Sequence, residues 1–439
     1  MLNNKKVFIL GMARSGYEVA KLLYKENEII ICDSKNQDIS KLSELNSLGV
    51  KFIKTDKPEE LLDETYDILI KNPAVFPNHP CVLKANQLNI PVVNEMEVAF
   101  HYITMPIKII GVTGSNGKTT TVTLINEVLK KAGVNVILGG NIGTPLSKLI
   151  SDIKGNEILL LEISDHQLID FKDFKTDISI LTNICPTHLD HHGSYEAYKN
   201  SKKRIFKYHT NNDIAIINKA NADSLEITND ILSKKIYFNN ESNFIKDDKI
   251  YINNEPIINT NEILLKGIHN YENILAMLTL LDILNIDFKY AKEVLKEFKG
   301  VEHRIEFVRE LNGVKYYNDA KSTNPTSTIT ALNSFDGNIH LILGGMERNQ
   351  DFSELNPCLN KIKKIYAIGE VRKRLLAYAI ENNIEVEEHE YLKDALDSIK
   401  NKVVTNDIVL LSPGSASWDQ YPKFEDRGSE FKNIVNNFE

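Results

Sequence analysis

Several features that would place this chain of 439 residues in a specialised class are missing. It has four cysteines, at positions 32, 81, 185 and 358, and no C-x-x-C pair, which argues against a structural zinc site and a disulfide framework. No apolar run approaches the roughly 18 residues that a membrane-spanning helix needs. The short run VFIL near the N-terminus leads directly into a glycine turn and is too short for a signal peptide. We therefore expect a cytoplasmic protein without a membrane partner.

The chain also lacks an excess of basic residues. Its 52 Lys and Arg residues against 60 Asp and Glu residues give a net charge of −8, and no basic stripe is evident. We therefore expect no nucleic-acid partner. Anionic small molecules remain possible substrates, because local loops capture them regardless of the overall charge. The sequence has no internal repeat or low-complexity tract, and its length predicts two to four ordinary globular domains.

Short apolar runs that end in Gly, Ser or Asp alternate with helical segments along most of the chain. The first 35 residues are typical of a strand, a glycine turn, a helix and a second strand, and further blocks begin near residues 107 and 301. Between residues 235 and 266 the pattern changes to short strands with Asn- and Asp-rich turns. We predict an α/β protein of three domains: a Rossmann-like domain at 1–104, a central P-loop ATPase-like parallel sheet with a small β insertion at 105–299, and a Rossmann-like domain at 300–439.

The segment IIGVTGSNGKTTT, at residues 109–121, lies between a predicted strand and a predicted helix. Its glycines do not have the usual P-loop spacing. Backbone N–H groups and the helix N-terminus can still surround a polyphosphate, Lys118 can neutralise it, and the Thr119 hydroxyl can bind Mg²⁺. A tight turn followed by a lysine is the alternative. The candidate phosphate-binding residues are Gly114, Ser115, Asn116, Gly117, Lys118, Thr119 and Thr120.

This loop resembles the ATP loop of the Mur ligases, the enzymes that extend the peptidoglycan precursor. Their pattern, Gly-x-x-Gly-x-x-Gly-Lys-Thr, fits the glycines at 111, 114 and 117. The resemblance covers essentially the entire chain and implies an ATP-dependent, amide-forming ligase. In KGIHNYENILA it implies that Asn270 and Asn273 approach ATP, although helix caps would otherwise be the simpler interpretation. In the third domain it implies ATP contacts for Arg304, Asp319 and Lys321.

The segment LLLEISDHQL places Glu162 at the end of a predicted buried strand, where a carboxylate can ligate Mg²⁺ beside the loop. A solvated strand end is the alternative. The family has Glu-x-Ser-Ser-Phe-Gln-Leu here. This chain has Asp165 and His166 in place of the second Ser and the Phe, and it keeps Ser164 and Gln167. The resemblance implies a metal role for Glu162.

The next segment, NICPTHLDHHGSYEAYKNSKKRIF, contains a His and Asp cluster at residues 188–192. A di-metal hydrolase is disfavoured, because the cluster lacks the order of such sites and adjacent loop residues point apart. The resemblance implies that His188 binds a second Mg²⁺ and that Lys202 is carbamylated, with Lys203 as the register alternative. From the residues alone these lysines would form a solvated helix face. The implied catalytic residues are Lys118, Glu162, His188 and Lys202, and the implied ligands of two Mg²⁺ ions are Thr119, Glu162, His188 and carbamylated Lys202.

At the N-terminus, Gly11, Ala13 and Gly16, with Asp33 about twenty residues on, nearly form a dinucleotide-binding fingerprint. Nicotinamide-nucleotide binding is therefore an alternative for this domain. In the Mur ligases the same loop binds a UDP diphosphate. The implied UDP-substrate residues are Gly11, Ala13, Arg14, Ser15, Asp33, Ser34, Asn72, Pro73, Asn141, Ser164 and Gln167.

Near the C-terminus, LLSPGSASWDQYPKF resembles the segment Ser-Pro-Ala-x-Ala-Ser-x-Asp-x-Phe of the family branch that adds D-glutamate to UDP-N-acetylmuramoyl-L-alanine through an acyl phosphate. The implied D-glutamate residues are Thr323, Arg348, Ser417 and Phe424, and Arg348 stands where the family has a lysine. A related Mur or folylpolyglutamate-type ligase and an ATP-hydrolysing switch protein are the alternatives. We expect a monomer that acts on small molecules.

Overall fold

The computed structural model describes residues 2–187 and 189–439. The chain divides into two compact units, Met1–Glu262 with Ile268–Val294 and Ile263–Gly267 with Leu295–Glu439. Among the described residues, no helix has the length and apolar composition required to cross a membrane.

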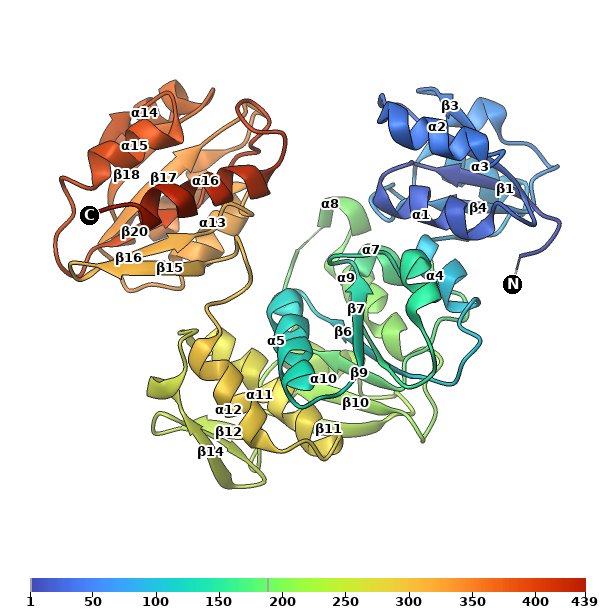
Figure 1. Ribbon diagram of the computed structural model, residues 1–439, viewed down its shortest axis with the longest axis horizontal. Helices are drawn as coiled ribbons and strands as arrows, with labels where there is room; N and C mark the ends of the chain where they lie inside the picture. Colours follow the sequence, from blue (N-terminus) through green and yellow to red (C-terminus); the bar gives the residue numbers. More distant parts are fainter. Residues whose placement is uncertain (1, 188) are drawn as a thin grey trace. The chain divides into compact units, whose positions relative to one another are not determined.

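The first sheet, in the blue part of Figure 1, has five parallel strands in the order β3-β2-β1-β4-β5. Alternate residues of β1 enter different apolar clusters, Val7 and Ile9 in one, Phe8 and Leu10 in the other, so both faces are covered. The strand order reverses between β1 and β4, where open α/β sheets bind ligands. The elements are β1 (Lys6–Leu10), α1 (Arg14–Leu23), β2 (Glu28–Asp33), α2 (Ile39–Ser47), β3 (Lys51–Lys54), η1 (Pro58–Leu61), β4 (Ile68–Lys71), α3 (Pro80–Gln87), β5 (Val92–Val93) and α4 (Glu95–Phe100).

The second sheet has six parallel strands in the order β11-β10-β9-β6-β8-β7. In the register, Gly111 of the central strand β6 lies opposite Leu161 of β8 and Ser179 of β9. The strands are β6 (Lys108–Thr113), β7 (Val136–Gly140), β8 (Ile158–Glu162), β9 (Ile178–Leu181), β10 (Ile214–Asn218) and β11 (Lys234–Phe238). The helices are α5 (Lys118–Lys131), α6 (Leu146–Leu149), η2 (Ile150–Asp152), α7 (Asp165–Leu168), α8 (Leu189–His192), α9 (Tyr195–Lys203), η3 (Arg204–Phe206), α10 (Ala222–Ile227), α11 (Ile268–Ile283) and α12 (Phe288–Glu297).

A small antiparallel sheet follows β11, as the Asn- and Asp-rich segment predicted. It consists of β12 (Phe244–Lys246), β13 (Lys249–Ile252) and β14 (Glu255–Asn259), and η4 (Thr260–Glu262) ends it. Several asparagines and aspartates in its turns have a positive φ, among them Asp247, Asp248 and Asn253. These residue types tolerate the left-handed conformation better than other non-glycine residues, which explains their abundance in this segment.

The third sheet, in the orange to red part of Figure 1, has the strand order β15-β16-β20-β17-β18-β19. Its strands are parallel except for the antiparallel pair β15 and β16. The α/β fold class is confirmed, and the domain bounds 1–104, 105–299 and 300–439 stay a prediction. The elements are β15 (Glu306–Leu311), β16 (Val314–Asn318), α13 (Pro325–Leu332), β17 (Ile339–Gly344), η5 (Phe352–Lys361), β18 (Ile362–Ile368), α14 (Arg372–Glu381), β19 (Glu385–Glu388), α15 (Leu392–Ile399), β20 (Ile408–Leu411) and α16 (Phe424–Asn436).

Candidate active site

The glycine-rich loop connects the end of β6 to the start of α5, at the carboxyl edge of the second sheet. Gly117 has a φ of 82°, and a Cβ atom there would lie 2.1 Å from Oδ1 of Asn273. Gly114 has a φ of 148°, and its Cβ would lie 2.0 Å from the Thr182 hydroxyl oxygen. Both positions therefore require glycine, because the backbone is left-handed and a neighbouring side chain occupies the space of a Cβ.

Side chains within the loop are fixed by hydrogen bonds. Lys118 Nζ donates to the carbonyl oxygens of Gly114 (2.8 Å) and Ser115 (2.9 Å), so its ammonium group lies over the loop backbone. The Ser115 hydroxyl lies 2.7 Å from the Tyr198 hydroxyl. The backbone N–H of Asn116 donates to Oδ1 of Asn183, which follows β9. The predicted loop residues thus form one ordered turn in front of α5, whose first residues after Lys118 are Thr119 and Thr120.

Glu162 is the last residue of β8 and is 2% exposed. Its Oε1 accepts a hydrogen bond from the Asn141 side-chain amide at 2.7 Å. Its Oε2 is buried and has no hydrogen-bond partner within residues 2–187 and 189–439. A buried carboxylate oxygen without a partner is unfavourable, and oxygen atoms of this kind are the ligands that Mg²⁺ prefers. Glu162 therefore fits a metal ligand. The contact with Asn141 was missed, because 21 positions separate the two residues.

Lys202 lies in α9 and is 0% exposed. Its Nζ is 3.2 Å from Asp165 Oδ1 and 3.3 Å from the Thr113 hydroxyl oxygen. Burial lowers the pKa of Lys202 to about 7; the positive charge of Lys118 acts in the same direction and Asp165 opposes it. Lys203, the register alternative, forms an ion pair with Asp230. Of the two lysines, Lys202 is therefore the one beside the loop.

The two departures from the family pattern, Asp165 and His166, begin the short helix α7. Asp165 is buried, and its Oδ2 lies 2.8 Å from His192 Nε2. The His166 ring lies 4.0 Å from the His191 ring at 90°, and the Phe76 ring lies 4.7 Å from the His191 ring. Asp165 is thus the acidic neighbour of Lys202, whereas His166 belongs to a cluster of rings.

The predicted metal ligand His188 lies outside the described residues. Ser164 and Gln167, predicted as UDP-substrate residues, form a capping box around the start of α7. The Ser164 N–H donates to Gln167 Oε1 at 2.9 Å, and the Gln167 N–H donates to Ser164 Oγ at 3.3 Å. This local pairing explains both residues as helix-cap residues next to Glu162.

Most of the other predicted UDP-substrate residues gather where β1, β2 and β4 of the first sheet end. Gly11 has a φ of 90°, and a Cβ atom there would lie 3.0 Å from the Asn72 Cβ. Asp33 Oδ2 accepts the N–H of Met12 at 2.8 Å, and the Asn72 amide lies 3.5 Å from the Ser15 hydroxyl. Ala13 caps α1, Arg14 bonds the carbonyl oxygen of Gly143, and Ser34 and Pro73 follow Asp33 and Asn72 directly. Asn141 instead lies at Glu162.

The remaining predicted ATP residues lie in both units. Asn270 and Asn273 are buried in the first turns of α11, and Asn273 is the side chain next to Gly117. Asp319 follows β16, where its Oδ2 accepts from the Ser412 hydroxyl at 2.7 Å and its Oδ1 accepts from the N–H of Ile305. Burial raises the pKa of Asp319 to about 6. The positive charge of Arg304 acts against this rise, and the N–H of Lys321, two positions after Asp319, donates to the carbonyl oxygen of His303.

The predicted D-glutamate residues lie near the carboxyl ends of the third sheet. Ser417 is buried, and its hydroxyl has no hydrogen-bond partner within the described part of the chain. Arg348 lies over the Trp418 ring, and Phe424 begins α16. Thr323 lies in the half-buried loop that follows Asp319 and Lys321.

One residue that no sequence pattern indicated connects the loops of the third sheet. Arg427 of α16 is buried, and its guanidinium group donates to the carbonyl oxygens of Ala320, Gly344 and Ser415 at 3.0–3.3 Å. These carbonyls lie at or after the ends of β16, β17 and β20 respectively. Arg427 therefore fixes the relative positions of the three loops that carry the predicted third-domain residues.

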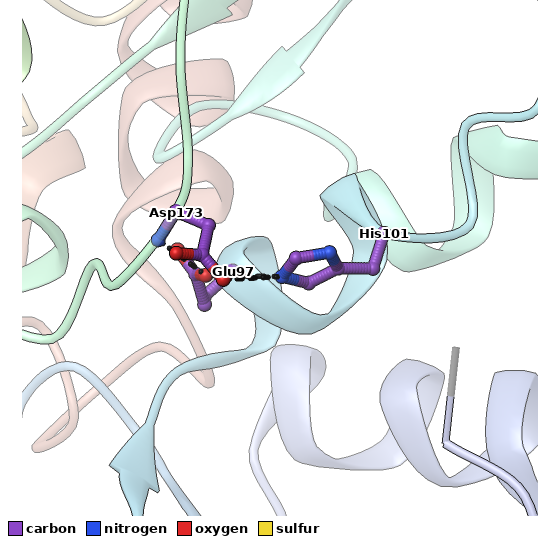
Figure 2. Close-up of side chains that lie close together, drawn as sticks. All are labelled: Glu97, His101 and Asp173. Carbon is purple, nitrogen blue, oxygen red and sulfur yellow. Dashed lines mark hydrogen bonds and ion pairs between the residues drawn. The ribbon is translucent and has the colours of Figure 1, made fainter. Parts of the chain in front are cut away.

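A separate group with metal-ligand chemistry, Glu97, His101 and Asp173, is shown in Figure 2. His101 Nε2 lies 3.2 Å from Glu97 Oε1. The two Glu97 oxygens also accept the backbone N–H groups of Lys172, Asp173 and Phe174 at 2.9–3.1 Å. The buried Glu97 carboxylate thus anchors the 172–174 loop to α4, which explains the cluster without a metal.

Models of the same protein family match segments of both units. The family model described as the Mur ligase middle domain matches residues 112–281, and the one described as the Mur ligase, glutamate ligase domain matches residues 303–414. A UDP-N-acetylmuramoylalanine--D-glutamate ligase of Geobacillus sp. (strain WCH70) is 37% identical over 440 residues, which cover 98% of this chain and 97% of that protein. A protein with the same name from Streptococcus pneumoniae (strain Hungary19A-6) is 38% identical over 439 residues, covering 98% and 97%.

Solved structures show the same fold at lower sequence identity. The UDP-N-acetylmuramate-alanine ligase of Thermotoga maritima has a TM-score of 0.60 at 18% identity and covers 99% of each chain. The MurF ligase of Thermotoga maritima, solved in complex with ADP, has a TM-score of 0.55 at 17% identity and covers 99% of this chain and 96% of that chain.

Proposed function

Because this chain belongs to the Mur ligase family, we propose that it uses ATP to join D-glutamate to UDP-N-acetylmuramoyl-L-alanine in the synthesis of the peptidoglycan precursor. The single observation that carries the catalytic part of this proposal is the arrangement beside the glycine loop. There the partnerless oxygen of Glu162 and the buried amine of Lys202 lie near the turn that holds Lys118. If Glu162 had only a structural role, we would expect both of its carboxylate oxygens to have hydrogen-bond partners, because buried polar groups normally have them.

The proposed reaction has two steps. A carboxylate oxygen of the L-alanine unit attacks the γ-phosphorus of ATP, so that ADP leaves and an acyl phosphate forms. The amine of D-glutamate then attacks the acyl carbon, loses a proton, and expels inorganic phosphate that carries one oxygen of the original carboxylate. Two anions must meet in the first step, and Lys118 and Arg304 would reduce their repulsion.

Divalent metal ions would supply further positive charge at the phosphates. Thr119, Glu162, His188 and carbamylated Lys202 are the proposed ligands of two Mg²⁺ ions. The partnerless Glu162 oxygen fits this role, because a hard cation takes carboxylate oxygens. The Asn141 amide holds the other oxygen of Glu162 and thereby orients the carboxylate.

The environment of Lys202 suits carbamylation. A carbamate forms when a neutral amine attacks CO₂ and releases a proton, and a pKa of about 7 leaves a substantial neutral fraction at neutral pH. Protein loaded with ¹³C-bicarbonate should give a carbamate signal in the ¹³C NMR spectrum. The signal should vanish in Lys202→Ala and persist in Lys203→Ala, whose side chain is paired with Asp230. A signal that survives in Lys202→Ala would reject this part of the proposal.

The remaining substrates are assigned by the predicted residues. The residues at the carboxyl ends of the first sheet would bind the UDP part, including Gly11, Asp33 and Asn72, which the structure brings together. Thr323, Arg348, Ser417 and Phe424 would bind D-glutamate, for which the partnerless Ser417 hydroxyl offers a hydrogen bond.

We place the reaction in the cytoplasm, where ATP is supplied, and propose that a monomer performs it. Size-exclusion chromatography with light scattering tests the oligomeric state and should give the mass of a single chain.

Oxygen transfer tests the acyl phosphate directly. When the carboxylate of the UDP substrate carries ¹⁸O, the phosphate released during turnover should contain one ¹⁸O atom, which mass spectrometry detects. Unlabelled phosphate would contradict the acyl-phosphate route. It would leave the identity of the amino-acid acceptor open to a separate comparison of acceptors.

A further inference from the structure

An arginine and a tryptophan are stacked at the edge of the proposed D-glutamate site. Arg348 lies in the loop after β17, and Trp418 lies in the loop after β20, directly next to Ser417. The guanidinium carbon of Arg348 lies 5.5 Å from the centre of the Trp418 ring. The Trp418 residue is 59% exposed, so the stacked pair lies at the surface where a ligand can reach it.

The two loops are held in a fixed register, so this stacking does not depend on two independently moving segments. The N–H of Gly344 donates to the carbonyl of Pro413 at 2.7 Å, and the N–H of Met346 donates to the carbonyl of Ala416 at 2.8 Å. The Gln350 amide adds a bond of 2.5 Å to the Ser415 hydroxyl. The ring therefore provides a rigid platform beneath the arginine.

The N–H groups of Arg348 are available to a ligand. Within residues 2–187 and 189–439, its guanidinium group has no hydrogen bond or ion pair. The neighbouring arginines differ, because Arg374 pairs with Glu347 and Arg427 is bound by three carbonyls. Stacking on the face of an aromatic ring uses none of the in-plane N–H donors of a guanidinium group, which match the two oxygens of a carboxylate.

We propose that Trp418 is a positioning residue that holds the Arg348 guanidinium flat, so that its in-plane N–H groups bind a carboxylate of the acceptor amino acid. This inference rests on the proposed function and adds a residue to it. An arginine in this loop needs such a platform more than a lysine does, because a planar fork binds in one orientation and a point charge does not. The partnerless hydroxyl of Ser417, adjacent to Trp418, lies on the same loop and offers a second contact.

Kinetics of four variants test the positioning role. Trp418→Leu should raise the KM for D-glutamate about two- to five-fold, the effect of an exposed cation–π contact, and leave kcat and the KM values for ATP and the UDP substrate unchanged. Trp418→Tyr keeps a ring and should restore a KM near that of the wild type. In an Arg348→Met background, which alone should raise this KM about 10- to 100-fold, Trp418→Leu should have no further effect.

Tyr391→Leu is the matched control, because it removes another exposed aromatic ring from the same domain. A Trp418→Leu variant with an unchanged KM for D-glutamate would overturn the inference. So would a loss that adds in full to that of Arg348→Met, or one that raises the KM values of all three substrates alike.

Fluorescence provides a second measurement that does not depend on turnover. Trp418 is the only tryptophan of the chain, so all tryptophan emission reports on this position. D-Glutamate, added to the full chain with Mg²⁺, a non-hydrolysable ATP analogue and the UDP substrate, should give a saturable change with a midpoint near its KM. L-Glutamate should give none, and Arg348→Met should shift the midpoint upward. A response with the same midpoint in Arg348→Met would overturn the inference.

The inference and the proposed function fail in different ways. D-Glutamate-dependent turnover with silent tryptophan emission would refute the role of Trp418 and leave the ligase standing. An absence of D-glutamate-dependent turnover would refute the proposed acceptor, and the inference with it.

Discussion

Gly117→Ala has two expected effects, one on the left-handed backbone of the glycine loop and one on the neighbouring Asn273 side chain. The new alanine would have to adopt the left-handed backbone conformation of Gly117, which is unfavourable for alanine by about 1–2 kcal/mol. Its Cβ atom would also lie 2.1 Å from Oδ1 and 2.9 Å from Cγ of Asn273, so the asparagine side chain must move away from the loop. If Asn273 contacts ATP as proposed, its displacement removes a hydrogen bond to a charged group, worth about 1.5–3 kcal/mol, and raises the KM for ATP about 10- to 100-fold.

Gly133→Ala is the matched control at the other end of the same helix. Gly133 has a φ of 75°, close to the 82° of Gly117, and apart from its two chain neighbours no described residue has an atom within 4 Å of the place that an alanine Cβ would occupy there. The backbone penalty is thus the same, and the clash is absent. Gly117→Ala should therefore lower the Tm at least as much as Gly133→Ala does, whereas Gly133→Ala should retain the KM of the wild type for ATP.

Steady-state phosphate release measures the KM, and thermal unfolding with and without Mg-ATP measures binding to the folded state. Mg-ATP should raise the Tm of the wild type and of Gly133→Ala, and it should raise that of Gly117→Ala much less. Equal KM values and equal Tm shifts in the two variants would refute the proposed contact between Asn273 and ATP.

Three further predictions concern buried charges. Burial raises the pKa of Glu95 to about 7, whereas in an unfolded chain it is 4.5, so the native state holds the proton more tightly. The free energy of unfolding should therefore fall by about 3 kcal/mol as the pH rises from 4.5 through 7. Glu95→Gln, whose oxygen can still accept from the Ser147 N–H, should lose this dependence in unfolding measured between about pH 5 and 8; an unchanged pH profile would reject the account. Lys202→Ala should abolish phosphate release and bicarbonate should not restore it, whereas Lys203→Ala should stay near the wild type; full activity of Lys202→Ala would remove that lysine from the site. Arg427→Met should lower the free energy of unfolding by about 3 kcal/mol or more and raise the KM for D-glutamate, because three carbonyls lose their donor; unchanged unfolding would contradict its role as a clamp.

The sequence predicted the fold class because strands of parallel sheets are buried on both faces and therefore form continuous apolar runs. Runs such as ILLLE in β8 are visible without any knowledge of the fold. The glycine loop was equally readable, because its glycines stand where the backbone is left-handed or another residue packs against it. The small β insertion followed from its asparagine- and aspartate-rich turns.

Residues of the site that depend on tertiary packing were harder to predict. From the residues alone, SKKRI indicated a solvated helix face, yet Lys202 is fully buried while its neighbour Lys203 pairs with an acidic residue near the surface. Helical spacing cannot show which lysine faces the sheet until the helix is packed. Arg427 had no detectable signal, because its partners are backbone carbonyls of three distant loops. The Ser164–Gln167 capping box, in contrast, has a signal in the sequence, the Ser-x-x-Gln pattern, although both residues were predicted only to bind the UDP substrate.

The most direct test of the central claim is phosphate release by the purified full chain with Mg-ATP and UDP-N-acetylmuramoyl-L-alanine, compared for D-glutamate, L-glutamate, L-lysine and D-alanyl-D-alanine as acceptors. The account predicts release that depends on D-glutamate and on none of the other three. Release at the same rate without any acceptor would indicate an ATP-hydrolysing switch and contradict the account, as would release that depends on a different acceptor.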